Sequence, residues 1–308
     1  MAYTNRSDVN YLGRLALIGA NQTPLLNMLG GLAGGIYRTS QSFIFPVAQP
    51  YSLSAGSQPE VTETESVTSR TATTVTRDQD LNTVQIFQET VEVSKAKQST
   101  VGEISGLSAV GVQPVQDEFG FQKDAALRQI AVNLEFSMLN GTYQAAANAT
   151  TGAKMGGLAT VISTNSTATT GATLTKTLMD SMFQTMAASG ALFENVVIFC
   201  NAFQKTKISD IYGYAPTDRN VGGVNVKQIE TDFGVVGVMY DPQVATDDVY
   251  AVEMSVMSLM FVPTEGQLII FEDLAKIAAS KKGEWYAQIG LDYGAEEYHG
   301  ALTGLATE

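Results

Sequence analysis

A polar stretch from about residue 57 to residue 99 constrains this chain more than any other feature of the sequence. It is rich in Thr, Ser, Val, Glu and Gln, and it holds two strand-like runs, 61–67 and 84–93, separated by a polar tip at 77–80. The pattern predicts a long β-hairpin. Because such a hairpin is polar on much of both faces, and an isolated two-stranded ribbon is only marginally stable in water, it needs another surface to lie on. A second copy of the same chain is an economical candidate, since strand edges favour pairing between chains.

The clearest helix signal runs from about residue 117 to about residue 139. Apolar residues recur there at three- and four-residue steps, as at Leu127, Ile130 and Leu134. Acidic residues open the segment and Asn140-Gly141 closes it, as is typical of helix ends. At about 1.5 Å per residue the helix would be roughly 35 Å long. Its apolar surface is wider than one stripe, so we expect it to cross a sheet.

The first 55 residues predict an arm that crosses the surface of the fold. Short apolar clusters are interrupted by glycines, which excludes a long helix. The segment is locally basic in an acidic chain: its cations are Arg6, Arg14 and Arg38, and its single acid is Asp8.

Beyond the long helix, a segment rich in Thr, Ala and Gly at about 142–173 predicts a loop with one short strand near 158–162. Helices and strands then alternate. Thr175 and Asn201 are expected to cap two helices, with a buried strand at 195–200 between them. Further strands are expected at about 223–230, 235–240, 249–253, 259–262, 268–271 and 284–293, with a turn at 231–234. This order of elements predicts an α+β fold.

Charge and composition exclude several classes of protein. With 308 residues, of which 44% are hydrophobic, the chain can bury a substantial core. The formal net charge of -13 argues against tight binding to nucleic acid, because an acidic surface repels phosphates. A single cysteine, Cys200, excludes a disulfide within one chain. The apolar N-terminal region is too interrupted for a signal peptide or a membrane span, so we expect maturation in a cytoplasm.

Two features, one at a pair of glycines and one at the single histidine, match functional motifs only in part. Gly30 and Gly35 have the separation of a phosphate-binding loop, but Ile36 and Tyr37 follow where that chemistry needs Lys and Ser or Thr. His299 is the only histidine, and its spacing from Glu296 and Glu297 matches no trusted metal site. We therefore expect a hinge at the glycines and a solvated turn at the histidine.

The remaining acidic and methionine clusters favour structural roles. Asp241, Asp247 and Asp248 lie around Pro242 in an expected exposed connection. Methionines recur at three-residue steps from Met254 to Met260, which is typical of core packing. No catalytic, cofactor-binding or metal-binding residues are expected, and the sequence does not indicate an enzyme.

Three local stretches, together with the order of segments, carry a resemblance to a known family. They are Thr217-Asp218-Arg219 followed by Gly222-Gly223-Val224, the turn Thr231-Asp232-Phe233-Gly234, and the run from Gly283-Glu284-Trp285-Tyr286 to Tyr298-His299-Gly300. Over essentially its whole length the chain resembles the tailed-bacteriophage major capsid proteins of the Hong Kong 97-type fold, in the branch typified by phage SU-ten. The resemblance implies an N-terminal arm (1–55), an extended β-hairpin loop (56–104), a peripheral domain with a long spine helix (105–165), an axial α/β domain (166–262) and strands returning to the peripheral domain (263–308).

The resemblance also implies a function. The chain would be a structural protein that self-assembles through pentamers and hexamers into the icosahedral head around a phage dsDNA genome, in the cytoplasm of a host bacterium. Scaffold, portal and cementing proteins are candidate partners, dsDNA would be touched only weakly and without specificity, and no membrane is involved. Polar contacts between subunits are expected from the loop and the arm, at Arg70, Arg77, Asp78, Asp80, Arg6 and Arg14.

Two other functions compete with this prediction. An encapsulin-like nanocompartment would keep the fold and enclose an enzyme, for which a groove for cargo peptides would be the sign. A cytoplasmic α/β enzyme would instead show a deep pocket with perturbed carboxylates. A tail component of the phage is a further alternative.

Overall fold

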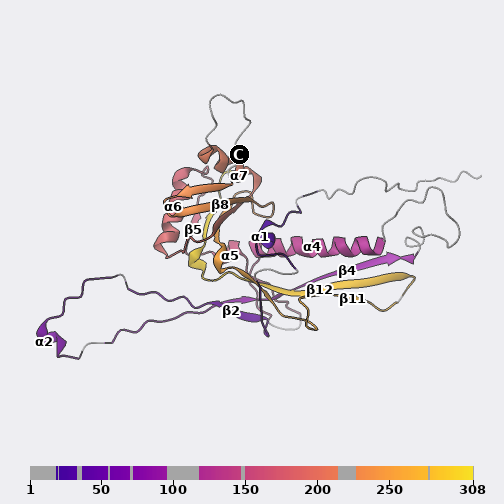
Figure 1. The fold of residues 1–308 in the computed structure, drawn as a ribbon, viewed down its shortest axis with the longest axis horizontal. Coiled ribbons are helices and arrows are strands. Elements are labelled where there is room, and N and C mark those ends of the chain that lie inside the picture. The colour runs from indigo at the N-terminus through magenta and orange to yellow at the C-terminus, as the bar shows by residue number, and fades with distance from the viewer. Residues whose placement is uncertain are drawn as a thin grey trace, which may run out of the picture.

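Two sheets and one long helix organise the chain in the computed structural model (Figure 1). It describes residues 19, 21–32, 37–54, 56–69, 72–95, 118–146, 150–213, 227–276 and 278–307. The helices are α1 (Pro24–Met28), α2 (Glu63–Ser66), α4 (Glu118–Asn140), α5 (Leu158–Val161), α6 (Lys176–Ala188), α7 (Ala202–Tyr212), η1 (Met254–Val256) and η2 (Glu296–Tyr298). The strands are β1 (Tyr37–Thr39), β2 (Ile44–Ala48), β3 (Asp80–Thr83), β4 (Gln85–Ser94), β5 (Ser166–Ala168), β6 (Val196–Cys200), β7 (Gln228–Thr231), β8 (Gly234–Tyr240), β9 (Val249–Glu253), β10 (Ser258–Phe261), β11 (Ile269–Asp273), β12 (Ser280–Asp292) and β13 (Gly300–Thr303).

The first sheet, called here the peripheral sheet, has the order β1-β10-β12-β11, and β4 also pairs with β12. The long helix α4 lies along β4 and β12 (Figure 1), as its broad apolar surface predicted. Its residues at three- and four-residue steps, Ile130, Leu134 and Met138, are fully buried. The predicted helix is therefore confirmed within one residue at each end.

The second sheet, called here the axial sheet, has the order β5-β13-β9-β6-β8-β7 and carries α6 and α7 (Figure 1). Both predicted caps are confirmed: the Thr175 hydroxyl accepts a hydrogen bond from the N–H of Leu178, and the Asn201 side chain accepts one from the N–H of Ala202. β6 and β9 are buried at every position, in line with their continuous apolar runs.

Side-chain alternation along β6 divides the interior between two hydrophobic clusters. Val197 and Phe199 join the larger cluster with the spine helix α4 and the peripheral sheet, whereas Ile198 and Cys200 face the cluster under α6. The axial sheet is thus packed on both faces. The larger cluster is continuous from one sheet to the other, so spine helix and axial sheet share one core.

Residues 49–79, called here the extended loop, project far from both sheets (Figure 1). The predicted β-hairpin is wrong: the described residues of this loop form no strand, and the helix α2 stands where the first strand was expected. A capping box explains α2, since the Thr62 hydroxyl accepts from the Glu65 N–H while the Glu65 carboxylate accepts from the Thr62 N–H. β3 pairs with β2 at the root of the loop, and the correctly predicted strand β4 pairs with β12.

Smaller differences concern other segments. The short strand predicted near 158–162 is the helix α5, and β5 lies in the segment predicted as loop. β10, inside the predicted axial range 166–262, pairs in the peripheral sheet, and β13, inside the predicted return strands 263–308, pairs in the axial sheet. The methionines of the 254–260 stripe are buried, so their predicted packing role is confirmed. Among the described residues, no helix combines the length and the apolar character needed to span a membrane.

Candidate assembly interface

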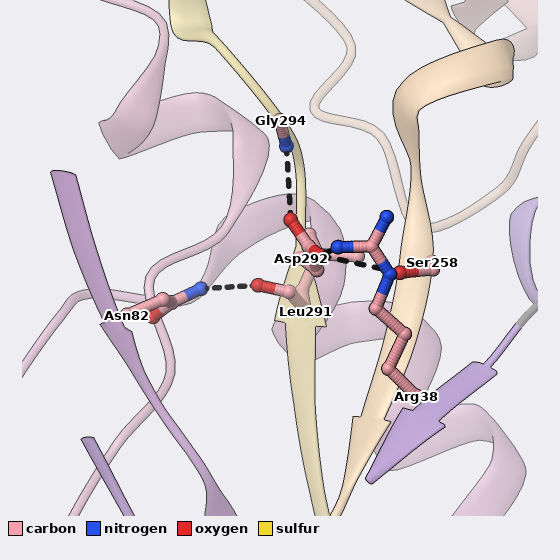
Figure 2. Close-up of polar contacts among 6 residues, drawn as sticks. All are labelled: Arg38, Asn82, Ser258, Leu291, Asp292 and Gly294. Carbon is pink, nitrogen blue, oxygen red and sulfur yellow. Dashed lines mark hydrogen bonds and ion pairs between the residues drawn. The ribbon is translucent and has the colours of Figure 1, made fainter. Parts of the chain in front are cut away.

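The root of the extended loop is fixed to the fold by one buried amide. The side chain of Asn82, on β3, is 1% exposed. Its Nδ2 donates to the carbonyl oxygen of Leu291 at 2.7 Å, which Figure 2 shows, and to that of Gly156 at 3.2 Å. Its Oδ1 accepts from the N–H groups of Gly156 at 2.8 Å and Thr83 at 2.9 Å. One side chain therefore joins β3, the end of β12 and the segment before α5, with every polar atom of the amide satisfied.

A buried carboxylate lies beside this amide, at the end of β12 (Figure 2). Asp292 is 2% exposed and forms an ion pair with Arg38 of β1 at 3.1 Å. It also accepts from Ser258 at 3.3 Å and from the N–H of Gly294 at 3.2 Å. Burial raises the pKa of Asp292, while the Gly294 N–H, the Arg38 guanidinium and the Ser258 hydroxyl each act to lower it. The arm strand β1 is thereby held to both β10 and β12.

An open hollow of about 1170 Å³ lies next to this ion pair. Its walls come from the end of β2 at 47–48 and from the two arms of the extended loop at 49–52 and 76–78. Residues 188–190 at the end of α6 and the turn after β12 complete them. Arg38 and Asp292 reach into its lining. The hollow separates the root of the loop from the axial helices, and its walls combine charged, polar and apolar side chains.

Along the extended loop, apolar side chains are unusually exposed. Leu53 is 71% exposed, Val67 is 84% exposed and Tyr51 is 64% exposed. Isolated exposed apolar residues are common, but here they follow one another along a segment that has no core of its own. Among the described residues of the loop, one backbone bond joins its two arms, from the N–H of Asp78 to the carbonyl oxygen of Pro50. The loop is therefore shaped to contact another surface.

Two ionisable residues that the sequence placed in solvent are buried. Asp241 is fully buried beside Glu135 of the spine helix, so the predicted exposed connection is wrong at that residue. His299 is also fully buried: its Nδ1 accepts from the N–H of Glu253, and its Nε2 lies 2.6 Å from the carbonyl oxygen of Tyr293. Burial lowers the pKa of His299, which favours the neutral ring. The predicted solvated turn is thus wrong at His299.

The predicted contact residues fall into two groups. Arg77 and Asp78 are exposed, line the hollow and lie just before β3 in the chain, at the root of the loop. Asp80 opens β3, where burial and then the charges of Glu297, Glu296 and Asp78 raise its pKa. Three predicted contacts lie outside the described residues, namely Arg6, Arg14 and Arg70.

Sequence reasoning missed Asn82, Asp292 and Glu135, the residues that hold the segments together. A polar residue inside a strand-like run was the available signal for Asn82, because a buried amide must find partners. Among the described residues, no group of three or more His, Cys, Asp or Glu side chains is arranged to hold a metal ion.

Comparison with known proteins places this geometry in a family. The family model described as SU10 major capsid protein matches residues 1–306. No curated protein matches the sequence. The capsid of cyanophage A-1(L) has a similar structure, with a TM-score of 0.68 at 14% identity over 97% of this chain and 96% of that one.

Two further solved structures share the fold. The capsid of a native GTA particle gives a TM-score of 0.61 at 11% identity, over 97% of this chain and 94% of that one. The SrpI encapsulin of Synechococcus elongatus gives 0.56 at 9% identity, over 96% of this chain and 93% of that one. At these identities the structures establish the Hong Kong 97-like fold, which phage capsids and encapsulins have in common. The match to the family model over nearly the whole chain decides between the two: the chain belongs to the SU10 major capsid protein family, and it is a structural capsid protein of a virion, not an enzyme.

Proposed function

We propose that this capsid protein assembles through pentamers and hexamers into an icosahedral head that encloses double-stranded DNA, and that the extended loop clasps a neighbouring copy. A ring of copies presents one patch of each subunit to a different patch of the next, which suits a chain whose loop and body have different surfaces. The proposal is supported chiefly by the exposed apolar side chains of the loop.

The extended loop has few internal contacts that would hold its shape in an isolated subunit. Beyond the bond between Asp78 and Pro50, the described stretch 49–79 has no strand ladder, and α2 has only four residues. Ordering such a segment without burying apolar area is unfavourable. Contact with a second copy would cover Leu53 and Val67 and supply partners to the free backbone groups, so that ordering and assembly occur together.

The loop can be removed without disturbing its root, because Pro50 and Asp78 are already joined by a hydrogen bond. Replacing residues 51–77 by a short glycine-rich turn should leave the unfolding transition close to that of the intact chain and abolish closed shells. Electron microscopy and light scattering measure the shells, and circular dichroism measures the folding. Shells of normal size from the shortened chain would refute the clasping role.

Polar contacts at the same interface are proposed for Arg77 and Asp78, which are exposed beside the hollow, and for Asp80, Arg70, Arg6 and Arg14. Substituting Arg77 by Gln should weaken assembly more than substituting Lys207 by Gln, since Lys207 is a half-buried cation of α7 that stands over Phe203. For each variant, the midpoint of assembly, which is the protein concentration at which half of the protein is assembled, is measured under the same conditions. Equal midpoints would exclude Arg77 from the contact.

The contents of the shell test the proposed head directly, because encapsulins share this fold. A net charge of -13 gives the chain little attraction for phosphates, so DNA would be confined without being gripped. Shells purified from infected cells should hold nuclease-protected dsDNA. A protein cargo in its place would favour an encapsulin-like compartment. Scaffold, portal and cementing proteins are proposed partners, to be sought by mass spectrometry of the same particles.

A further inference from the structure

A buried acidic pair connects the spine helix to the axial sheet. Glu135, on the inner side of α4, is fully buried. Its two oxygens accept hydrogen bonds from the backbone N–H groups of Leu25 at 2.7 Å and Leu26 at 2.8 Å, in α1. These bonds fix the carboxyl group in place, because turning it away would leave two buried N–H groups without acceptors.

The second carboxyl belongs to Asp241, which directly follows β8 and is also fully buried. Its Oδ1 accepts from the N–H of Gln243 at 2.8 Å. Its Oδ2 receives no hydrogen bond from any N–H or hydroxyl group of the described residues, whereas the carboxyl of Glu135 lies within hydrogen-bonding reach. Two carboxyl groups can bond to each other only when one of them carries a proton, since ionised carboxylates are acceptors alone.

No cation offsets the charge of this pair in the described part of the chain. The titratable groups that act on the pair are the two carboxyls themselves, and α1 has no ionisable side chain. The nearby Cys200 thiol is itself affected, since burial and Asp241 raise its pKa. Burial first, and then Asp241, raises the pKa of Glu135 to about 9. Burial also raises the pKa of Asp241. A doubly charged pair at this place would be strongly unfavourable.

We propose that Glu135 and Asp241 share one proton, and that this proton acts as a latch that keeps the axial sheet seated on the spine helix. Glu135 is held by two N–H groups of α1, and Asp241 is held by the N–H of Gln243 in its own turn. Neither carboxyl can turn away freely, so the shared proton is what allows the two to meet. The bond from Asn140 of the spine helix to the carbonyl oxygen of Gln243, at 2.8 Å, is a second link at the same seam.

The latch has a defined pH dependence. The seated state keeps the proton up to about pH 9, whereas an opened, hydrated Glu135 would lose it near its ordinary pKa of 4.5. Stability of the seated state is therefore fully present below the ordinary pKa and is lost progressively as the pH rises to about 9. In that window the ratio of opened to seated molecules should rise by up to about tenfold for each pH unit.

Hydrogen exchange of the full-length protein tests the latch. Protection factors are measured between about pH 6 and about pH 9 for peptides that cover α1 and the turn 241–248, after correction for the intrinsic exchange rate at each pH. In the wild type, protection at both places should fall together, by up to about tenfold per pH unit. In Glu135→Gln the amide oxygen can accept from α1 and the amide nitrogen can donate to Asp241 without a titrating proton, at the loss of one of the two bonds to α1. Protection should therefore be lower than in the wild type but nearly independent of pH.

Two companion variants keep the test decisive. Asp241→Asn can donate to an ionised Glu135 and should weaken the pH dependence, although burial still raises the pKa of Glu135. This second variant guards against failure of the first to fold. Glu253→Gln is the matched control: Glu253 is fully buried and accepts from the N–H groups of Glu194 and Asn195, but lies outside the seam. The Glu253→Gln variant should keep the wild-type dependence of protection on pH. The latch is refuted if protection in the wild type does not change with pH. It is also refuted if both Glu135→Gln and Asp241→Asn keep the wild-type pH dependence of protection, or if Glu253→Gln loses it.

Discussion

Replacing Asn82 by alanine should detach the root of the extended loop from the peripheral sheet. The substitution removes four hydrogen bonds that the buried amide makes with Leu291, Gly156 and Thr83. It also leaves the N–H groups of Gly156 and Thr83 without their acceptor, and water cannot easily reach them because Asn82 is 1% exposed.

The magnitude follows from the number of bonds. At a net value of about 1 kcal/mol for each, four bonds give about 4 kcal/mol, a large part of the 5–15 kcal/mol roughly typical of a domain. Because the lost contacts join β3 to the end of β12 and to the segment before α5, the damage should extend to the geometry of the loop. Closed shells should therefore fail at a temperature at which the chain is still folded.

Denaturant unfolding measures the loss of stability, and electron microscopy across a temperature series measures the failure of closed shells. Asn27→Ala is the matched control, since Asn27 lies in α1 with an exposed side chain. It should change the free energy of unfolding by less than about 0.5 kcal/mol. A loss of less than about 1 kcal/mol in Asn82→Ala would show that the amide does not fix the root of the loop.

Two further tests address packing and pH. Gly290→Ala would place a Cβ atom 2.8 Å from Phe45 Cε1, so denaturant unfolding should show a loss of about 1–3 kcal/mol, whereas Gly56→Ala, with no atom within 4 Å, should be nearly neutral. Because burial lowers the pKa of His299 from 6.5, its contribution to stability is present above that value and is lost as the pH falls below it. The penalty of His299→Gln, measured against the wild type by denaturant unfolding at each pH, should therefore shrink by up to about 1.4 kcal/mol per pH unit on acidification, and a constant penalty would contradict this. The comparison within each pH is needed because Glu135 contributes with the opposite sign.

Local patterns in the sequence predicted local structure well. The spine helix α4 was predicted from its apolar spacing, and the axial helices α6 and α7 were predicted with the caps Thr175 and Asn201. All of these signals act within a few residues. The helix α2 has an equally local signal, the capping box between Thr62 and Glu65. It was missed because the surrounding β-branched residues favoured a strand.

Burial of polar groups could not be predicted in the same way. Asp241 stands before a proline in what reads as an exposed connection, and only the distant Glu135 makes its burial tolerable. His299 likewise depends on Glu253 and Tyr293, which come from a different strand and from the preceding turn. Such sites exist because the tertiary fold brings partners together, and no periodicity in the sequence records them.

The chain passes between its two sheets three times, and two of these crossings lie at almost the same place, which gives the subunit a particular mechanical character. One crossing runs from β9 into β10 and the other from β12 towards β13, and Ser258 and Asp292 are paired where they lie side by side. A force that pulls the sheets apart would load these two covalent backbones and the third connection, from α4 to β5, none of which stretches easily. A force that bends them would load only side-chain contacts such as those between α4 and the turn after β8. A shell made of such subunits would therefore change curvature far more readily than it would stretch.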